Sequence, residues 1–289
     1  MKPFALSAPA KINLTLEILG KRPDGYHELR MLMAGLGLAD RLAFRAAPDW
    51  RLACSRPDLG AGEDNLVTRA ARLLQATPAG RRRGPLGAAV RVTKNIPLGA
   101  GLAGGSSDAA QALRGLNRLW NLKLGPRALH ALARRLGSDV PYCLQGGWAL
   151  ARGRGEKLKG LSGMPDFWVA LLNPGFQVST AWAFSRARPA ASRANRTLEA
   201  IRILQRKDLA KLQDACVNDL EPVTAGRHPE IRKMKRLLLE QGAIASQMSG
   251  SGPSVWGLFS TKQNALKAVK ELKKKVNFCI VAQTISKLA

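Results

Sequence analysis

The first half of the chain mixes two hydrophobic periods. Apolar and polar side chains alternate in part near the N-terminus, and Gly-Lys-Arg-Pro-Asp-Gly at 20–25 interrupts that pattern with turn-forming residues. Further along, apolar residues recur three and four positions apart, which predicts amphipathic helices. We expect strands at 4–19, 27–38 and 88–93, with a loop at 77–87. We expect helices from 64 or 65 to 74, from the glycine-rich segment 97–107 to 120, from 126 to 137, and a short one capped by Ser138 with Asp139 in its first turn.

The second half follows a break around 160–165 and repeats this mixture on a smaller scale. Expected strands lie at 167–172, 255–259 and 278–284, and expected helices at 198–204, 209–216, 229–241 and 262–275. Strands and helices mix without strict βαβ order, so the predicted fold class is α+β rather than doubly wound. The break divides the chain into two predicted domains, 1–160 and 161–289.

Length and composition indicate an ordinary globular protein. The 289 residues are 46% hydrophobic, which is enough for a substantial core. Four cysteines and three histidines are scattered without a Cys-x-x-Cys pair or a His cluster, so we predict no metal-ligating set of residues. The N-terminus lacks a signal-type apolar core, and no stretch approaches the roughly 20 apolar residues that span a bilayer. We therefore expect a cytoplasmic protein with no membrane partner.

The charge balance is unusual, because 46 Lys and Arg against 20 Asp and Glu leave a net charge of +26. Such a balance attracts polyanions, and nucleic acid has to be considered as a partner. The basic residues are spread along the chain, however, with local runs only at 81–83 and 267–275, which we interpret as solvated surface. A compact anionic substrate would gain from the same field, so we expect a small-molecule substrate and no nucleic-acid partner.

The segment 94–108, K-N-I-P-L-G-A-G-L-A-G-G-S-S-D, is the most informative stretch of the sequence. Its glycines let backbone N–H groups approach an anion, and the helix that follows adds further unpaired N–H groups. It lacks the Gly-Lys-Ser/Thr ending of a Walker loop, and it is too long and too Ser-rich for a dinucleotide-binding turn. We predict a phosphate-binding loop of another type; a flexible loop that precedes a helix is the alternative.

Four segments taken together resemble the GHMP kinase superfamily. They are Pro-Ala-Lys-Ile-Asn at 9–13, Asp-Gly-Tyr-His at 24–27, the glycine-rich loop, and Gly-Ser-Asp-Val-Pro at 137–141. Further matching stretches lie at 63–66, 146–158, 218–222 and 248–254. The resemblance covers nearly the whole chain and implies a ribosomal-protein-S5-like N-terminal domain and a ferredoxin-like C-terminal α+β domain.

The first two segments resemble one branch of that superfamily, whose acceptor is 4-diphosphocytidyl-2-C-methyl-D-erythritol. The resemblance implies ATP-dependent phosphorylation of the acceptor's 2-hydroxyl, in the non-mevalonate pathway to isoprenoids. It places Lys11 and Asp139 beside that hydroxyl, where a carboxylate can take the proton and an ammonium can stabilise developing negative charge. The residues alone, without this resemblance, favour a helix-capping carboxylate for Asp139 and a surface lysine for Lys11.

The resemblance also assigns binding residues. Asn65 is expected to contact the adenine of ATP, with Lys94 beside the same pocket. Tyr26 is expected to stack on cytosine, His27 to read its edge, Phe184 to cover the opposite face, and Asn13 to bind near the acceptor hydroxyl or diphosphate. Mg²⁺ is expected to accompany ATP, held mostly by phosphates and water, with Ser107 as a candidate contact. The cradle for the ATP phosphates comprises Pro97, Leu98, Gly99, Ala100, Gly101, Leu102, Ala103, Gly104, Gly105, Ser106 and Ser107.

Several points stay open in the sequence. Ala103 occupies a position where this branch usually has glycine, and it would be strained if that position requires a positive φ. A second glycine-rich loop at 250–252 either closes over the phosphates or forms a tight turn before a strand. Rival functions are a related kinase acting on another small alcohol and a nucleic-acid-binding protein. The sequence leaves the oligomeric state open.

Overall fold

The computed structural model describes residues 2–60, 62–189 and 195–286. Its N-terminal part contains β1 (Phe4–Lys21), β2 (His27–Arg45), β3 (Trp50–Cys54), α1 (Leu66–Gln75), α2 (Pro78–Arg82), β4 (Ala88–Thr93), α3 (Gly104–Leu119), α4 (Pro126–Leu136), α5 (Val140–Gln145), β5 (Trp148–Gly153) and β6 (Lys157–Gly160). Its C-terminal part contains β7 (Trp168–Asn173), α6 (Thr180–Arg186), α7 (Arg196–Arg206), α8 (Leu212–Ala215), α9 (Glu221–Arg227), α10 (Glu230–Glu240), β8 (Ala245–Met248), β9 (Val255–Phe259), α11 (Lys262–Leu272) and β10 (Phe278–Ile285). The α+β prediction is confirmed.

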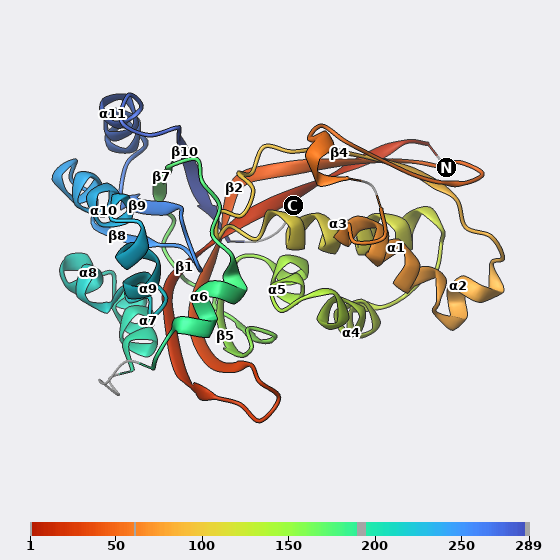
Figure 1. The fold of residues 1–289 in the computed structure, drawn as a ribbon, viewed down its shortest axis with the longest axis horizontal. Helices are drawn as coiled ribbons and strands as arrows, with labels where there is room; N and C mark the ends of the chain where they lie inside the picture. Colours follow the sequence, from red (N-terminus) through yellow and green to blue (C-terminus); the bar gives the residue numbers. More distant parts are fainter. Residues whose placement is uncertain (1, 61, 190–194, 287–289) are drawn as a thin grey trace.

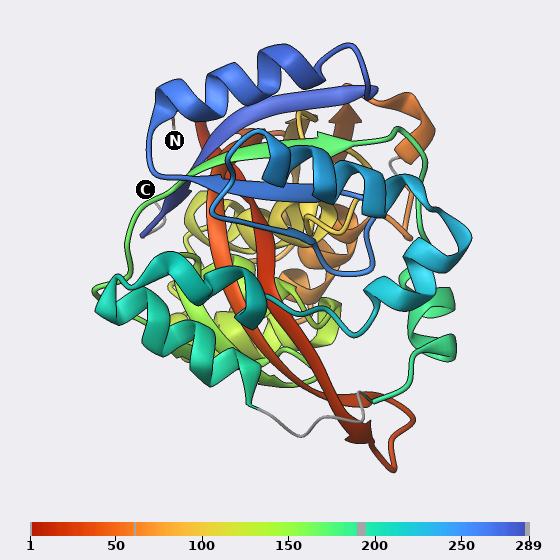
Figure 2. The same cartoon turned by 90° about the vertical axis from the view of Figure 1, so that its left-hand side faces the viewer.

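The strands form one mixed sheet in the order β3-β4-β2-β10-β7-β9-β8, with β1 and β5 also paired to β2. Helices α1, α3, α4 and α5 form a layer beside the long β1–β2 hairpin, whereas α10 and α11 cover the sheet at the C-terminal end (Figures 1 and 2). Strand β10 returns from the C-terminal part to pair with β2 at Thr284↔Leu36. The domain division at 160/161 therefore stays a prediction, because one sheet runs through both parts.

Two irregularities in β1 decide which side chains reach the site. The register with β2 shifts between Pro9 and Lys11 and again between Asn13 and Thr15. In a regular strand all even-numbered side chains would share one face, and a bulge exchanges the faces. The even-numbered residues of β1 accordingly divide between two core clusters. One cluster contains Ala8, Leu16 and Ile18, and the other contains Ala10, Ile12 and Leu14. Between the bulges, Lys11 and Asn13 therefore take the side that faces α3 and α5.

The opposite side of the hairpin is fastened to α7 by a buried carboxylate. Glu17 forms a two-pronged ion pair with Arg30, with N···O distances of 2.9 and 3.0 Å. The same carboxylate accepts the backbone N–H groups of Arg196 and Thr197 at the start of α7. It thus satisfies donors that a helix leaves unpaired at its first turn. This attachment holds the hairpin that carries Lys11 and Asn13.

The structure corrects several predicted elements. The predicted loop at 77–87 contains α2, which begins at Pro78 after a Thr77 side-chain cap. Asp139, rather than Ser138, is the N-cap residue of α5, β2 extends to Arg45 and α11 ends at Leu272. The pattern did not indicate β3, β5, β6, β8, α6 or α9, each of which has only four to seven residues. Within the described ranges, every helix is too short or too polar to cross a bilayer.

Candidate active site

One cavity of about 970 Å³ opens between the β1–β2 hairpin, the loop before α3, helix α6 and the loop between β8 and β9. Most residues predicted to contact ligands line it. They are Lys11, Asn13, Tyr26, His27, Asp139, Phe184 and the ten consecutive residues 97–106. Three other predicted residues, Asn65, Lys94 and Ser107, are not among the described residues that line it. The two ends of the predicted site therefore share one cavity.

Lys11 and Asp139 face each other inside this cavity. The Lys11 ammonium lies 3.7 Å from the Asp139 carboxylate and donates a hydrogen bond of 2.7 Å to the Asn13 side-chain oxygen. The Lys11 side chain is 5% exposed, whereas that of Asp139 is 34% exposed. Lys11 is thus not a surface lysine, and Asn13 holds its ammonium in place from the same strand. The geometry brings an ammonium and an accessible carboxylate together, as the predicted chemistry requires.

Asp139 reaches the cavity because it does not cap its own helix. It occupies the N-cap position of α5, yet its side chain makes no capping hydrogen bond. Directly behind it, burial and then the charge of Asp139 raise the pKa of the Cys143 thiol well above its usual range. That thiol is buried and stays protonated at neutral pH, whereas the Asp139 carboxylate is partly exposed. Because the Asp139 side chain makes no capping hydrogen bond, the structure does not support the helix-capping alternative, and the role of Asp139 as a base stays a prediction.

The loop before α3 turns its carbonyl groups into the protein. Four consecutive carbonyl oxygens, those of residues 99–102, accept hydrogen bonds from the N–H of Val178, the N–H of Ser254, the Ser249 hydroxyl and the N–H of Lys11. The N–H groups of Gly101, Gly104, Gly105 and Ser106 have no acceptor among the described residues. Unpaired donors at the start of a 16-residue helix suit an anion. The loop therefore presents a set of backbone donors to the cavity, and its contact with phosphate stays a prediction.

The second glycine-rich loop lies against the first. Gly250 and Ser251 line the cavity, and the Ser249 hydroxyl bonds to the Gly101 carbonyl at 2.9 Å. The Asn218 side chain donates to the carbonyls of Met248 and Gly250, each at 2.8 Å. The segments at 218–222 and 248–254 thus meet in space, and the second loop borders the phosphate cradle rather than forming only a turn before β9.

Ala103 adopts a left-handed backbone conformation, with φ of 58° and ψ of 29°, at the N-cap of α3. This conformation brings the Cβ of an L-residue close to the following carbonyl and costs about 1–2 kcal/mol for residues other than glycine. The methyl group that replaces the usual glycine is therefore strained, which answers the question left open by the sequence.

Ala103→Gly is expected to raise the free energy of unfolding by about 1 kcal/mol, since relief of the strain outweighs the extra chain entropy of glycine. Urea unfolding followed by circular dichroism measures the change. Ala131→Gly, in the exposed interior of α4, serves as the matched control and should instead lose about 1 kcal/mol. A loss of stability in both variants would show that position 103 is unstrained.

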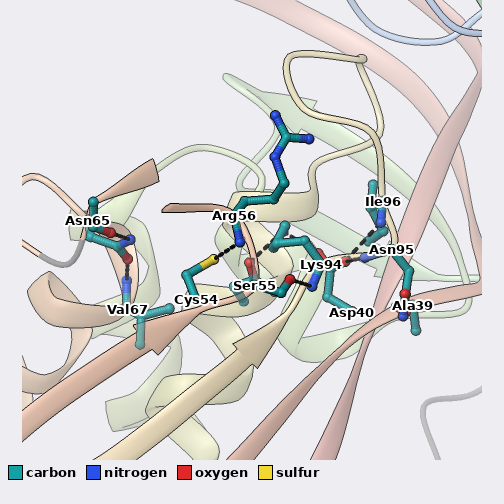
Figure 3. A network of polar contacts seen from close by, with 12 residues as sticks. Ala39, Asp40, Cys54, Ser55, Arg56, Asn65, Val67, Lys94, Asn95 and Ile96 are labelled. Carbon is teal, nitrogen blue, oxygen red and sulfur yellow. Dashed lines mark hydrogen bonds and ion pairs between the residues drawn. The ribbon is translucent and has the colours of Figure 1, made fainter. Parts of the chain in front are cut away.

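Asn65 and Lys94 have structural partners of their own (Figure 3). The Asn65 side chain caps α1 by accepting the Val67 N–H at 2.9 Å and donates to the Gly60 carbonyl at 3.0 Å. The Lys94 ammonium lies between the carboxylates of Asp40 and Asp108, 2.6 Å from the latter. Each residue therefore supports local structure next to the cavity; the contact of Asn65 with adenine and the place of Lys94 beside that pocket stay predictions.

The Lys94 cluster lies beneath the start of α3. Burial opposes its ammonium form, but Asp108 and Asp40 outweigh that effect and raise the pKa of Lys94. Burial raises the pKa of Asp108 to about 7, whereas Asp40 also accepts the backbone N–H groups of Asn95 and Ile96. The cluster ties β2, the end of β4 and α3 together behind the phosphate loop.

The opposite end of the cavity is aromatic and basic. The Arg154 guanidinium lies 4.3 Å from the centre of the Tyr26 ring, and that tyrosine is 52% exposed. The rings of His27 and Phe184 stack at 5.4 Å with an angle of 27° between their planes. Thr180, on the same helix as Phe184, shares a hydrogen bond of 3.0 Å with Ser251. Helix α6 therefore links the aromatic end to the second glycine-rich loop.

Sequence reasoning missed several cavity residues. Arg154 lines the cavity and lies within the stretch 146–158 that resembles the family. It could have been proposed as a ligand contact, because it is a basic residue between two glycines. Lys21, Ser138, Thr180 and Ser185 also line the cavity. Thr180 and Ser185 belong to α6, which the hydrophobic pattern did not reveal. Lys21 lies in the predicted turn segment 20–25 and Ser138 in the family-like segment 137–141, so those motifs could have pointed to both residues.

The chain is similar to known kinases over nearly its whole length. Residues 65–147 match the N-terminal domain of GHMP kinases, and residues 198–277 match the C-terminal domain. The chain is 45% identical, over 96% of its length and 97% of the relative's, to the 4-diphosphocytidyl-2-C-methyl-D-erythritol kinase of Pelotomaculum thermopropionicum. It superposes on a crystal structure of 4-(cytidine 5'-diphospho)-2C-methyl-D-erythritol kinase with a TM-score of 0.82 and 35% identity, covering 97% of this chain and 99% of that one. A homoserine kinase from Cytophaga hutchinsonii, 21% identical over 100% of this chain and 96% of its own with a TM-score of 0.77, shares the fold.

Proposed function

The chain belongs to the GHMP kinase family, and we propose that it is a 4-diphosphocytidyl-2-C-methyl-D-erythritol kinase. In this reaction the terminal phosphoryl group of ATP moves to the 2-hydroxyl of the acceptor, which yields the 2-phosphate and ADP. The step belongs to the non-mevalonate pathway of isoprenoid precursor biosynthesis.

One observation carries the proposal beyond family membership. A phosphate-type loop, the Lys11–Asp139 pair and the Tyr26–His27 end all open into one cavity of about 970 Å³. Phosphoryl transfer depends mainly on positioning and on electrostatic stabilisation, so a kinase needs both substrates held against one reacting centre. The cavity is large enough for the two substrates to meet.

In the proposed mechanism, Asp139 accepts the proton of the acceptor hydroxyl as the new bond to phosphorus forms. Lys11 lies 3.7 Å away and stabilises the negative charge that develops on the hydroxyl oxygen and on the transferring group. The 2-hydroxyl is tertiary and hindered, so its orientation matters more than its intrinsic nucleophilicity. Asn13 contributes by fixing the Lys11 ammonium with a hydrogen bond of 2.7 Å.

ATP is proposed to bind with its phosphates on the free N–H groups of residues 101–106. Mg²⁺ is part of the proposal, and it would supply charge neutralisation on the phosphates. The Ser107 hydroxyl is buried at the first turn of α3 near the Cys143 thiol and is not among the residues that line the cavity, so its contact with the metal stays a prediction. The described residues include no group of three or more His, Cys, Asp or Glu that could hold a metal.

A coupled ADP-release assay tests the function. With ATP and Mg²⁺ present, ADP is expected only when the cytidylylated acceptor is added. Mevalonate and homoserine serve as parallel acceptors, because related kinases share this fold. Turnover with either alcohol but not with the cytidylylated acceptor would overturn the substrate assignment.

Tyr26→Ala is expected to raise the KM for the acceptor by about 10-fold to 100-fold, since base–aromatic stacking contributes about 1–3 kcal/mol per base. The KM for ATP should change less than twofold, because Tyr26 lies at the hairpin end of the cavity. Steady-state kinetics with each substrate varied in turn gives both constants. Tyr26→Phe, which keeps the ring, should behave like the unmodified protein; equal effects of Tyr26→Ala on both substrates would discredit the stacking role.

A further inference from the structure

Carboxylates are missing from a long part of this basic chain. Between Asp64 and Asp139, the sequence contains eleven arginines and two lysines but one acidic residue, Asp108. Thirteen cations against one carboxylate give residues 65–138 a net charge of +12, nearly half of the +26 of the whole protein. The excess charge is therefore concentrated in one quarter of the chain, and it comes from arginine rather than from lysine.

The fold leaves six of these arginines exposed on α1, α2 and α4. Asp108 is 5% exposed and paired with Lys94, so it does not offset the surface charge. Helix α1 packs against both α2 and α4, and α3 separates α4 from the long strands (Figure 1). Six exposed arginines on these helices form no ion pair with a described residue, and we name them the arginine face: Arg69, Arg81, Arg82, Arg127, Arg134 and Arg135.

The chemistry of this face favours a nucleic acid over an inserted membrane helix or an apolar protein interface. A helix that inserts into a membrane needs a free apolar face, but the apolar sides of α1 and α4 are buried in the core. The core of a protein–protein interface is apolar and often aromatic, yet the five large apolar side chains exposed in the described ranges all lie outside residues 65–138. A nucleic-acid backbone needs neither, because arginine forks and released counterions supply the affinity.

We propose that the arginine face binds the phosphodiester backbone of RNA without reading its sequence. The expectation of no nucleic-acid partner relied on cations being spread along the chain; the uneven distribution of carboxylates changes that picture. This binding is independent of phosphoryl transfer, because the six arginines are not among the residues that line the cavity.

Fluorescence anisotropy with a labelled 20-nucleotide oligouridylate, over a series of KCl concentrations, tests the proposal. Each phosphate neutralised on a single strand contributes about −0.7 to the slope of log Kobs against log salt. The test variant removes four charges from the face and the control removes four from α11 and the residues after it. The test variant carries Arg82→Gln, Arg127→Gln, Arg134→Gln and Arg135→Gln; the control carries Lys267→Gln, Lys270→Gln, Lys273→Gln and Lys274→Gln.

The test variant is expected to lose about three units of slope, since four contacts at about 0.7 each are removed. Its affinity at 0.1 M KCl should fall at least 10-fold more than that of the control. Both variants should retain full ADP release with the acceptor, which shows that they fold. Equal losses in the two variants, absence of saturable RNA binding at 50 mM KCl, or binding to phosphatidylserine vesicles in place of RNA would each overturn the proposal.

Discussion

Asp139→Asn is expected to lower kcat by about 10³-fold while the Kd for ATP changes less than twofold. A positioned general base contributes about 10²–10⁴ to the rate, and an amide of the same shape cannot accept the proton. The substitution leaves α5 intact, because the Asp139 side chain makes no capping bond. The coupled ADP-release assay gives kcat, and calorimetry with ATP gives the Kd.

Asp208→Asn is the matched control for that experiment. Asp208 is the N-cap residue of a short 3₁₀ helix at Leu209–Lys211 and also makes no side-chain capping bond, but it is exposed and not among the residues of the cavity wall. It should leave both constants unchanged. Retained turnover in Asp139→Asn would remove Asp139 from the role of base, whereas a large loss of ATP affinity would assign it to nucleotide binding instead.

The parts of the fold with long periodic patterns could be predicted from the sequence. Helix α4 has the predicted proline at its start and glycine after its end, and β4 has the expected bounds. The Lys11–Asp139 pair could be proposed because family-like motifs surround both residues. Its burial and its 3.7 Å separation could not, since 128 positions separate the two residues along the chain.

The features that decide the geometry of the site cannot be recognised in a hydrophobic pattern. The register shifts between β1 and β2 on either side of Lys11 and Asn13 turn these residues toward α3, but shifts of one or two residues do not alter the hydrophobic pattern enough to be seen. The inward-turned carbonyls of residues 99–102 depend on donors supplied by Val178 and by the second glycine-rich loop. Contacts between distant segments of this kind appear only once the chain is folded.

The same contacts make Gly101 the least replaceable residue of the phosphate loop. Its φ is +74°, and a Cβ built there would lie 2.0 Å from the Ser249 carbonyl oxygen and 3.1 Å from the Gly252 nitrogen. Both neighbours are backbone atoms, which cannot rotate away as a flexible side chain could. A side chain at position 101 therefore has to push the two glycine-rich loops apart.

Gly101→Ala is expected to lower kcat/KM for ATP by about 10²-fold, because a displacement of about 1 Å at a reacting centre has an effect of that size. The left-handed conformation adds about 1–2 kcal/mol of destabilisation in alanine, which urea unfolding measures alongside the kinetics. Gly125→Ala is the control, since Gly125 has a φ of −75° and no heavy atom within 4 Å of a built Cβ. If Gly101→Ala kept the kcat/KM of the unmodified protein, the interlocked loops would not position the triphosphate, and the cradle would have to be sought elsewhere in the cavity.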